Sequence, residues 1–130
     1  MKTIISEAKP GEQLVDVIPL IAALEKFTTE RDWAQFHSPK NLVMALTGEV
    51  GELTEIFQWM TEEQSRAAGG DPDTSQAIKE ELADVLIYLV RLSSVLGVDL
   101  NQAVTHKLQL NARKYPVDKA KGSNKKYTEF

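Results

Sequence analysis

Two pairs of acidic residues share one spacing, three residues apart, in segments with the apolar periodicity of α-helices. Glu49 and Glu52 form the first pair, and Glu81 and Asp84 form the second. Residues three apart lie on one face of a helix, so each pair presents its carboxylates side by side. On a helical wheel, both pairs lie in or beside the apolar stripe that each helix would bury. The spacing therefore predicts a cluster of carboxylates where two helices meet.

Carboxylates at a buried helix contact need a proton, a basic partner or a metal ion, because dehydrating an unpaired charge is costly. Salt bridges are the alternative interpretation, but Lys79 and Arg91 wind onto other helix faces. Oxygen ligands without nearby histidine or cysteine favour a hard cation, Mg²⁺ or Mn²⁺. The chain has no cysteine, and neither of its histidines, His37 and His106, completes the Glu-x-x-His pattern of di-iron bundles.

Aromatic and basic side chains accompany the acids. Trp59 lies seven residues after Glu52, and Tyr88 lies seven after Glu81, so each aromatic shares a helix edge with an acid. A later helical edge carries two lysines and an amide that suit phosphate oxygens, although lysines beside an apolar stripe can simply extend into solvent. These three residues are Lys107, Asn111 and Lys114. Together the groups predict a magnesium site for polyphosphate chemistry.

Two glycines, Gly48 and Gly51, bracket Glu49 inside the expected helix. Each costs about 1 kcal/mol relative to alanine in a helix interior. Close approach of a second helix or of the metal cluster is one explanation, and close packing without function is the other. Both explanations place other atoms near the glycines.

Four helical segments position these residues. The second begins at Ser38 and Pro39, because serine caps a helix and proline suits its first position. Gly97 is a stop signal for the third helix, and Asp99 with Gln102 resembles a capping box for the fourth. A linker at 67–73 contains turn residues, and Pro116 ends the fourth helix. The expected helices cover residues 17–36, with Asp16 as N-cap, then 38–60, 74–96 and 99–115.

The fold class is therefore all-α, with one domain over residues 1–130. Residues 1–15 are an N-terminal extension, and residues 117–130 are a polar, lysine-rich tail, loosely held unless a ligand or neighbour orders it. The third helix is apolar on two sides, which predicts a homo-oligomer with helix-on-helix contacts. Its main stripe is Ile78, Leu82, Val85, Leu89 and Leu92, and Ala83, Ile87 and Val90 lie opposite.

The composition is that of a soluble globular protein, with 42% apolar and 26% charged residues. The formal net charge of −4 gives no electrostatic reason to expect a nucleic-acid partner. No apolar run approaches the length of about 20 residues that spans a membrane, and the N-terminus lacks the apolar core of a signal peptide. We therefore expect a cytoplasmic protein with neither a nucleic-acid nor a membrane partner.

The same residues resemble the MazG-type all-α nucleoside triphosphate pyrophosphohydrolases. Glu49-Val-Gly-Glu52 and Glu81-Leu-Ala-Asp84 match the ExxE and ExxD signature of that family. The likeness covers residues 27–129 and is strongest to the dCTP pyrophosphatase branch. It includes the segments Arg31-Asp-Trp33, Phe57-Gln-Trp59, Glu80–Leu89, Asn111–Pro116 and Lys126–Glu129.

The resemblance implies a four-helix MazG-like bundle assembled as a homotetramer, with a dimer as the alternative. It implies Mg²⁺-dependent hydrolysis of the α–β phosphoanhydride of a (deoxy)nucleoside triphosphate to the monophosphate and pyrophosphate. The expected substrate is dCTP or a modified dCTP, which is a house-cleaning activity on the nucleotide pool. The implied metal ligands are Glu49, Glu52, Glu81 and Asp84. Either Glu49 or Glu52 would activate water, and Glu49 is preferred because the helical wheel makes it the more enclosed of the two. The residues implied to bind substrate are Trp33, Trp59, Tyr88, Lys107, Asn111 and Lys114.

One departure from the family concerns the base pocket. Nine residues before Trp33, dCTP-preferring relatives can carry a histidine, and this chain has Leu24. A broad-specificity or damaged-nucleotide pyrophosphohydrolase is therefore an alternative, and a phosphoribosyl-ATP pyrophosphohydrolase is disfavoured by the aromatic residues. A nucleotide-binding module without catalysis is the alternative from another class, and it predicts binding without metal-dependent turnover.

Overall fold

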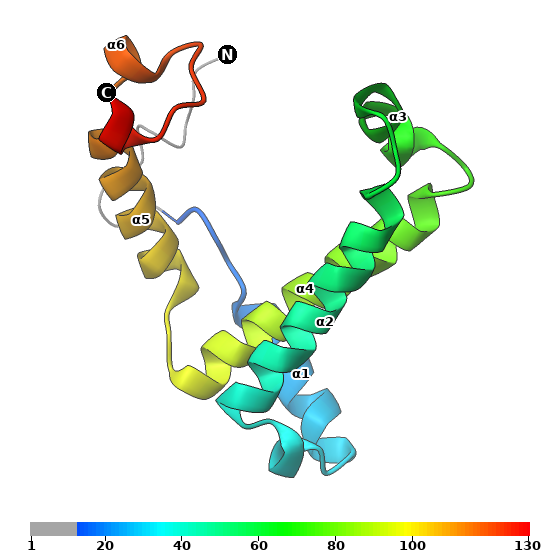
Figure 1. The fold of residues 1–130 in the computed structure, drawn as a ribbon. Helices are drawn as coiled ribbons and strands as arrows, with labels where there is room; N and C mark the ends of the chain where they lie inside the picture. Colours follow the sequence, from blue (N-terminus) through cyan, green and yellow to red (C-terminus); the bar gives the residue numbers. More distant parts are fainter. Residues whose placement is uncertain (1–12) are drawn as a thin grey trace. The chain divides into compact units, whose positions relative to one another are not determined.

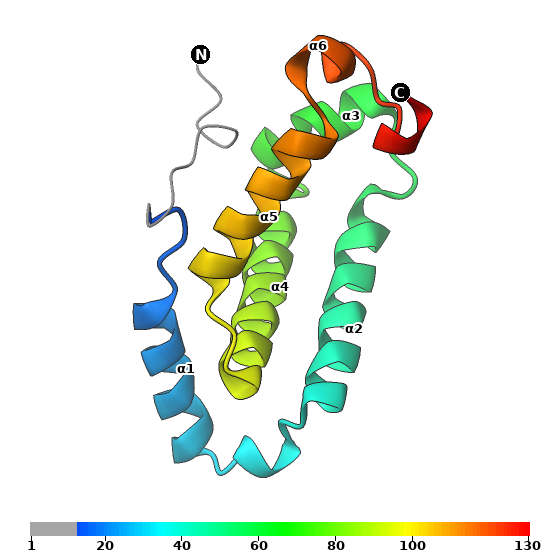
Figure 2. The ribbon, with the colours of Figure 1, turned by 90° about the vertical axis from the view of Figure 1, so that its left-hand side faces the viewer.

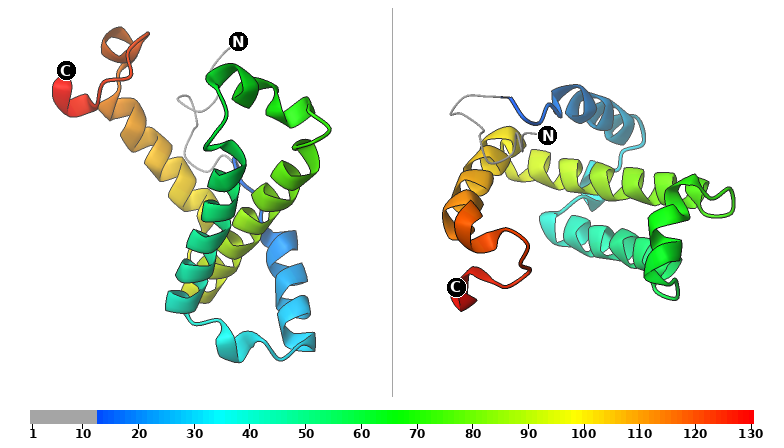
Figure 3. Two further views of the ribbon diagram at one scale, coloured as in Figure 1. Left: turned by 45° about the vertical axis from the view of Figure 1, so that its right-hand side comes forward. Right: turned by 90° about the horizontal axis from the view of Figure 1, so that it is seen from above.

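Helices α2 (Pro39–Phe57) and α4 (Ser75–Leu96) form the antiparallel pair that carries the acidic residues (Figure 1). The computed structural model describes residues 13–130. Two short helices, α3 (Glu62–Ala67) and η3 (Ala68–Gly70), connect α2 to α4 at one end of the pair (Figure 3). The described residues contain helices and turns and no strand, as the sequence predicts.

The boundaries of α2 and α4 follow local signals. The Ser38 hydroxyl accepts a hydrogen bond from the Asn41 amide at 3.2 Å, and Pro39 is the first residue of α2. Helix α4 stops at Gly97, whose φ of 69° is in the left-handed region. These two predicted boundaries are confirmed.

The first helix is shorter than predicted. The expected helix over 17–36 ends as α1 (Ile18–Glu30), and a turn leads into the single 3-10 turn η2 (Ala34–Phe36). Asp32 adopts a φ of 52°, which aspartate tolerates better than most residues and which a helix cannot contain. The Trp33 amide then donates to the Thr28 carbonyl at 3.0 Å. The N-cap position of α1 is Val17 rather than Asp16.

The segment between α2 and α4 holds a helix that the sequence analysis did not predict. Thr61 and Gln64 form a capping box at the start of α3: the Thr61 hydroxyl accepts from the Gln64 amide at 3.1 Å, and the Gln64 side chain accepts from the Thr61 amide at 2.9 Å. The Thr74 hydroxyl donates to the Ala68 carbonyl at 2.7 Å just before α4 begins. This segment is therefore ordered by its own polar side chains.

The buried apolar residues of this helical unit, residues 17–98, include Leu42 on α2 and Ile78 and Val90 on α4. Helix α1 lies along α4 as well (Figure 2). Val90 lies on the side of α4 opposite the main apolar stripe. It is nevertheless the most buried residue of α4, because α1 and the segment after α1 cover that side. Leu82 and Leu89, assigned to the main stripe, are exposed together with Leu86. The described chain therefore covers the main stripe at Ile78 and leaves it exposed at Leu82 and Leu89.

The second unit combines the described residues up to Asp16 with residues 99–130. Its helices are α5 (Leu100–Lys114), α6 (Val117–Ala120) and η4 (Tyr127–Glu129). Asp99 caps α5 by accepting from the Gln102 amide at 3.1 Å, and Asn101 Oδ1 accepts from the amides of Leu14 and Val15.

The lysine-rich tail packs onto the end of α5. Tyr127 and Phe130 make edge-on ring contacts with Tyr115, at centroid distances of 5.9 and 5.8 Å. Both rings stay exposed, at 42% and 41%, so these contacts leave the expectation of a loosely held tail as a prediction. Most of the predicted extension, residues 1–12, lies outside the described residues. None of the helices described here is long and apolar enough to span a membrane.

Candidate active site

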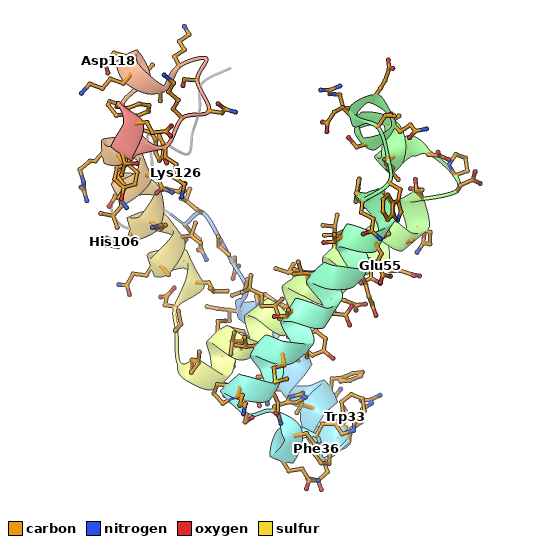
Figure 4. All side chains as sticks on the ribbon, viewed as in Figure 1. Trp33, Phe36, Glu55, His106, Asp118 and Lys126 are labelled. Carbon is orange, nitrogen blue, oxygen red and sulfur yellow. The ribbon has the colours of Figure 1, made fainter. Side chains whose placement is uncertain are left out.

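Three of the four predicted carboxylates come together where α2 faces α4. Ligand oxygens of Glu49, Glu52 and Glu81 all lie within 4.8 Å of one another. Glu49 and Glu81 are half-buried, whereas Glu52 is exposed, as are the neighbouring Glu55 (labelled in Figure 4) and Glu80. Helical winding therefore predicted that these three acids cluster, although exposure does not distinguish Glu52 from Glu55 and Glu80.

The buried oxygens of this cluster lack partners. Glu49 Oε2 and Glu81 Oε2 are inaccessible to solvent, and no described residue forms a hydrogen bond with either atom. Burial, contacts with Glu49 and Glu52, and their negative charge raise the pKa of Glu81 to about 7. Burial is also the main reason that the pKa of Glu49 is raised. The three carboxylates repel one another when all are ionised. A divalent cation would neutralise this charge and bind oxygens of all three, so the set of ligands fits Mg²⁺.

Asp84 stands apart from this group of three. It follows Glu81 by one helical turn and is close enough for its charge to raise the pKa of Glu49. Its side chain also lines a cavity of about 410 Å³ between α1, the segment after α1, and α4. Asp84 therefore links the carboxylate cluster to the cavity.

The cavity wall is mostly aromatic and aliphatic. Trp33 and Tyr88, both predicted to bind substrate, line it, and Trp33 meets Phe27 edge-on with ring centroids 5.7 Å apart. Trp33 lies in the segment between α1 and α2 (Figure 4), where its amide contact to Thr28 anchors it. Leu24, where the family resemblance led us to expect a histidine, is also in the wall. The volume and the flat aromatic surfaces suit a planar nucleobase.

Two polar residues of the wall were missed by the sequence analysis. Arg91 lines the cavity and donates from Nε to His37 Nδ1 at 3.0 Å. Its Nη1 bonds Glu25 Oε1 on α1 at 2.5 Å. No local motif marks these residues, since the partners are 54 and 66 positions apart. The one available signal was an arginine on the face opposite the main apolar stripe of α4.

The remaining predicted substrate residues are not part of this cavity. Trp59 follows the end of α2 and is 88% exposed. The three polar residues of α5 belong to the other unit, where Lys114 Nζ lies 4.8 Å from the centroid of the Tyr127 ring. Their assignment to the substrate stays a prediction: Lys107, Asn111 and Lys114.

The two glycines of α2 have open surroundings. A Cβ built on Gly48 or Gly51 meets no other heavy atom within 4 Å. Within the described chain, neither a second helix nor the carboxylates approach these positions closely. The expected crowding was therefore wrong for the single chain.

Comparison with known proteins places this fold and these residues in a family. Residues 45–130 match the MazG-like family. The chain belongs to the MazG-like family. This MazG-like chain is 52% identical over 121 residues to dCTP pyrophosphatase 1 of Homo sapiens, covering 93% of the chain and 69% of that relative. It is 50% identical to dCTP pyrophosphatase 1 of Mus musculus over the same shares.

A solved structure shows the same fold. The crystal structure of a pyrophosphatase from Archaeoglobus fulgidus matches with a TM-score of 0.71 and 36% sequence identity. The match covers 83% of this MazG-like chain and 99% of that one. The predicted all-α MazG-like fold is confirmed, as is the prediction of an enzyme resembling dCTP diphosphatases.

Proposed function

We propose that this MazG-like enzyme hydrolyses the α–β phosphoanhydride of deoxynucleoside triphosphates, with dCTP or a modified dCTP as the preferred substrate. The products are the nucleoside monophosphate and pyrophosphate. One observation carries the proposal. Glu49 and Glu81 each bury a carboxylate oxygen without a hydrogen-bond partner, and Asp84, one helical turn after Glu81, lines an aromatic cavity. The relatives named dCTP pyrophosphatase 1 support the choice of base.

The acids of α2 and α4 hold the cofactor in this proposal. Glu49, Glu52 and Glu81 have the geometry for a shared cation, and Asp84 completes the set from the cavity side. Mg²⁺ bound there, or Mn²⁺ in its place, would neutralise the phosphate oxygens and the charge that develops on departing pyrophosphate.

One of the same carboxylates activates water. Attack on the α-phosphorus requires a base that removes a proton from the attacking water. Glu49 is preferred over Glu52 for this role because it is half-buried, and burial raises its pKa above that of an ordinary carboxylate, which makes it a stronger base. Its proton leaves with the departing groups or to solvent once the anhydride bond is broken.

The cavity holds the base. Trp33 and Tyr88 offer flat surfaces for stacking, and the distance along α4 from Glu81 to Tyr88 is about two helical turns, or roughly 10 Å. This spacing suits a nucleotide whose phosphates reach the carboxylates while its base enters the cavity. Lys107, Asn111 and Lys114 are proposed to contact the sugar and phosphates in the assembled enzyme.

The proposed assembly is a homotetramer, with a dimer as the smaller alternative. The support is an exposed apolar surface on the helical unit, where Met44, Leu82 and Leu86 are 64%, 54% and 48% exposed. Surfaces of this kind usually mark protein contacts. Leu86→Glu is expected to shift the enzyme to smaller species in analytical ultracentrifugation, whereas exposed Glu55→Gln is expected to leave its mass unchanged.

A coupled pyrophosphate-release assay tests the proposed function. Initial rates are measured with magnesium for dCTP, 5-methyl-dCTP, dUTP, dTTP and the ribonucleotides. The proposal expects the highest kcat/KM for dCTP or its methylated form. Equal rates across the panel would favour the broad-specificity alternative, and tight binding without turnover of any triphosphate would favour the non-catalytic module.

A further inference from the structure

A buried arginine forms part of the cavity wall without a role in the proposed chemistry. The side chain of Arg91 is only 8% exposed. Its guanidinium is held from two sides, by His37 through Nε and by Glu25 through Nη1. A charge this deeply buried is costly, so its position in a ligand cavity calls for an explanation.

The contact with Arg91 sets the hydrogen-bonding character of His37. Arg91 Nε is only a donor, so His37 Nδ1 must be the acceptor. Burial and the nearby Arg91 charge both lower the pKa of His37, which keeps the ring neutral. A neutral imidazole with an unprotonated Nδ1 carries its hydrogen on Nε2. His37, a lining residue of the cavity, therefore has one N–H donor, on Nε2.

Glu25 sets the electrostatic character of the same wall. It pairs with the guanidinium, so the two charges cancel while the remaining N–H groups of Arg91 stay available. Of the five guanidinium N–H groups, contacts among the described residues engage the one on Nε and one of the two on Nη1. Asp84 is the other charged residue of the lining, so Arg91 and His37 offer hydrogen-bond donors on a wall without surplus positive charge. This character suits a neutral base edge made of acceptors better than it suits a phosphate.

We propose that Arg91, positioned by Glu25 and His37, determines specificity for cytosine by donating to the acceptor edge of the base. Cytosine presents two neighbouring acceptors, the O2 carbonyl and N3. Uracil and thymine carry a hydrogen on N3, which opposes a donor wall and leaves a buried N–H unpaired. This inference rests on the proposed function. It provides the polar recognition that Leu24, at the family's histidine position, does not supply.

The direct test compares dCTP with dUTP in the full-length enzyme. Arg91→Lys keeps the positive charge and the pairing with Glu25, but loses the planar fork and the Nε donor. The expected result is a loss of about tenfold or more in kcat/KM for dCTP, caused by a higher KM. The kcat/KM for dUTP is expected to change by less than about twofold. A thermal melt of each variant checks that the fold is intact.

A matched pair of acids on α1 separates base recognition from general charge effects. Glu25 and Glu30 have nearly equal side-chain exposure, 54% and 55%, and each pairs with a basic residue. Glu25→Gln is expected to reduce the dCTP preference in the same direction as Arg91→Lys. Glu30→Gln, whose partner is the exposed Lys26, is expected to leave the preference unchanged.

Equal losses for dCTP and dUTP in Arg91→Lys would overturn the inference, because they indicate a phosphate or purely structural role. Unchanged kinetics for both substrates would overturn it as well. Calorimetric binding of dCMP and dUMP provides a second reading that needs no turnover. If the parent hydrolyses neither triphosphate, the proposed function fails, and tighter binding of dCMP than dUMP, weakened by Arg91→Lys, still supports the inference. Equal binding of the two monophosphates by the parent would refute it.

Discussion

Glu49 on α2 and Glu81 on α4 bring carboxylate oxygens within 4.8 Å of each other, and each residue also buries one oxygen that no described residue hydrogen-bonds. Two like charges at this distance repel, and dehydration adds to the cost of ionising both. A proton relieves the pair in the absence of metal, and a divalent cation relieves it when metal is bound. This relationship underlies both the proposed catalysis and a distinct dependence of stability on pH.

Removal of the proposed base should abolish most of the activity. Glu49→Gln keeps the side-chain shape but cannot accept the proton from water, so kcat is expected to fall by about a hundredfold to ten-thousandfold. Glu55→Gln removes an exposed acid from the same helix and is expected to retain the parent rate. Pyrophosphate release from dCTP measures both, and parental turnover by Glu49→Gln would rule out its role.

The raised pKa of Glu81 should make the metal-free fold less stable as pH rises. Its pKa is about 7 in the folded chain against an ordinary 4.5, so only the folded chain keeps the proton between these values. The contribution of protonated Glu81 to the free energy of unfolding is complete below pH 4.5 and is lost as the pH rises to about 7. Urea unfolding across this range, in a chelator, measures the slope.

Two variants isolate that contribution. Glu81→Gln removes the titrating group and is expected to flatten the fall in stability, whereas Glu80→Gln, on the exposed side of α4, is expected to preserve it. Mg²⁺ affinity is also expected to rise with pH and to level off above about 7, because binding requires the ionised form of Glu81. An identical slope in the parent and in Glu81→Gln would contradict the assignment.

Trp33 should contribute to binding of the base. Its ring lines the cavity against Phe27, so Trp33→Ala is expected to raise KM for dCTP by about tenfold to a hundredfold through lost stacking. Phe36, three residues later and 59% exposed, is outside the cavity lining and provides the control. Steady-state kinetics distinguish the two, and an equal change in both variants would argue against a specific contact with the base.

Two glycines should respond to alanine in opposite directions. Gly97 has a φ of 69°, so Gly97→Ala is expected to destabilise the fold by about 1 kcal/mol. Gly51 is in the interior of α2 with open space around it, so Gly51→Ala is expected to stabilise by about 1 kcal/mol. Chemical denaturation measures both free energies of unfolding. Destabilisation by Gly51→Ala would show that the position contacts atoms outside the single chain.

The sequence predicted those parts of the fold that depend on local signals. Ser38, Pro39 and Gly97 act within one helical turn, so the start of α2 and the end of α4 could be placed. The end of α1 could not, because its periodicity continues past Glu30 while Asp32 takes a left-handed conformation. Helix α3 was missed because six residues are too few to show a period.

Some residues of the candidate site could likewise be predicted from the sequence, and others could not. The acids could be identified because their helical spacing is visible in the sequence, and the structure brings Glu49, Glu52 and Glu81 together. The polar wall of the cavity could not be identified, because Arg91 meets partners from two other segments of the chain. Contacts of this kind depend on how helices pack, which the pattern within each helix does not specify.

Hydrolysis in isotopically labelled water tests whether the carboxylate-held metal supports attack of water on the α-phosphorus. The enzyme is incubated with dCTP in water enriched in heavy oxygen, with Mg²⁺ and in parallel with a chelator, and the products are analysed by mass spectrometry. Attack on the α-phosphorus predicts heavy oxygen in dCMP, unlabelled pyrophosphate, and no products in the chelator. Label in the pyrophosphate, or an equal yield without metal, would contradict the proposed carboxylate-held metal site and its reaction.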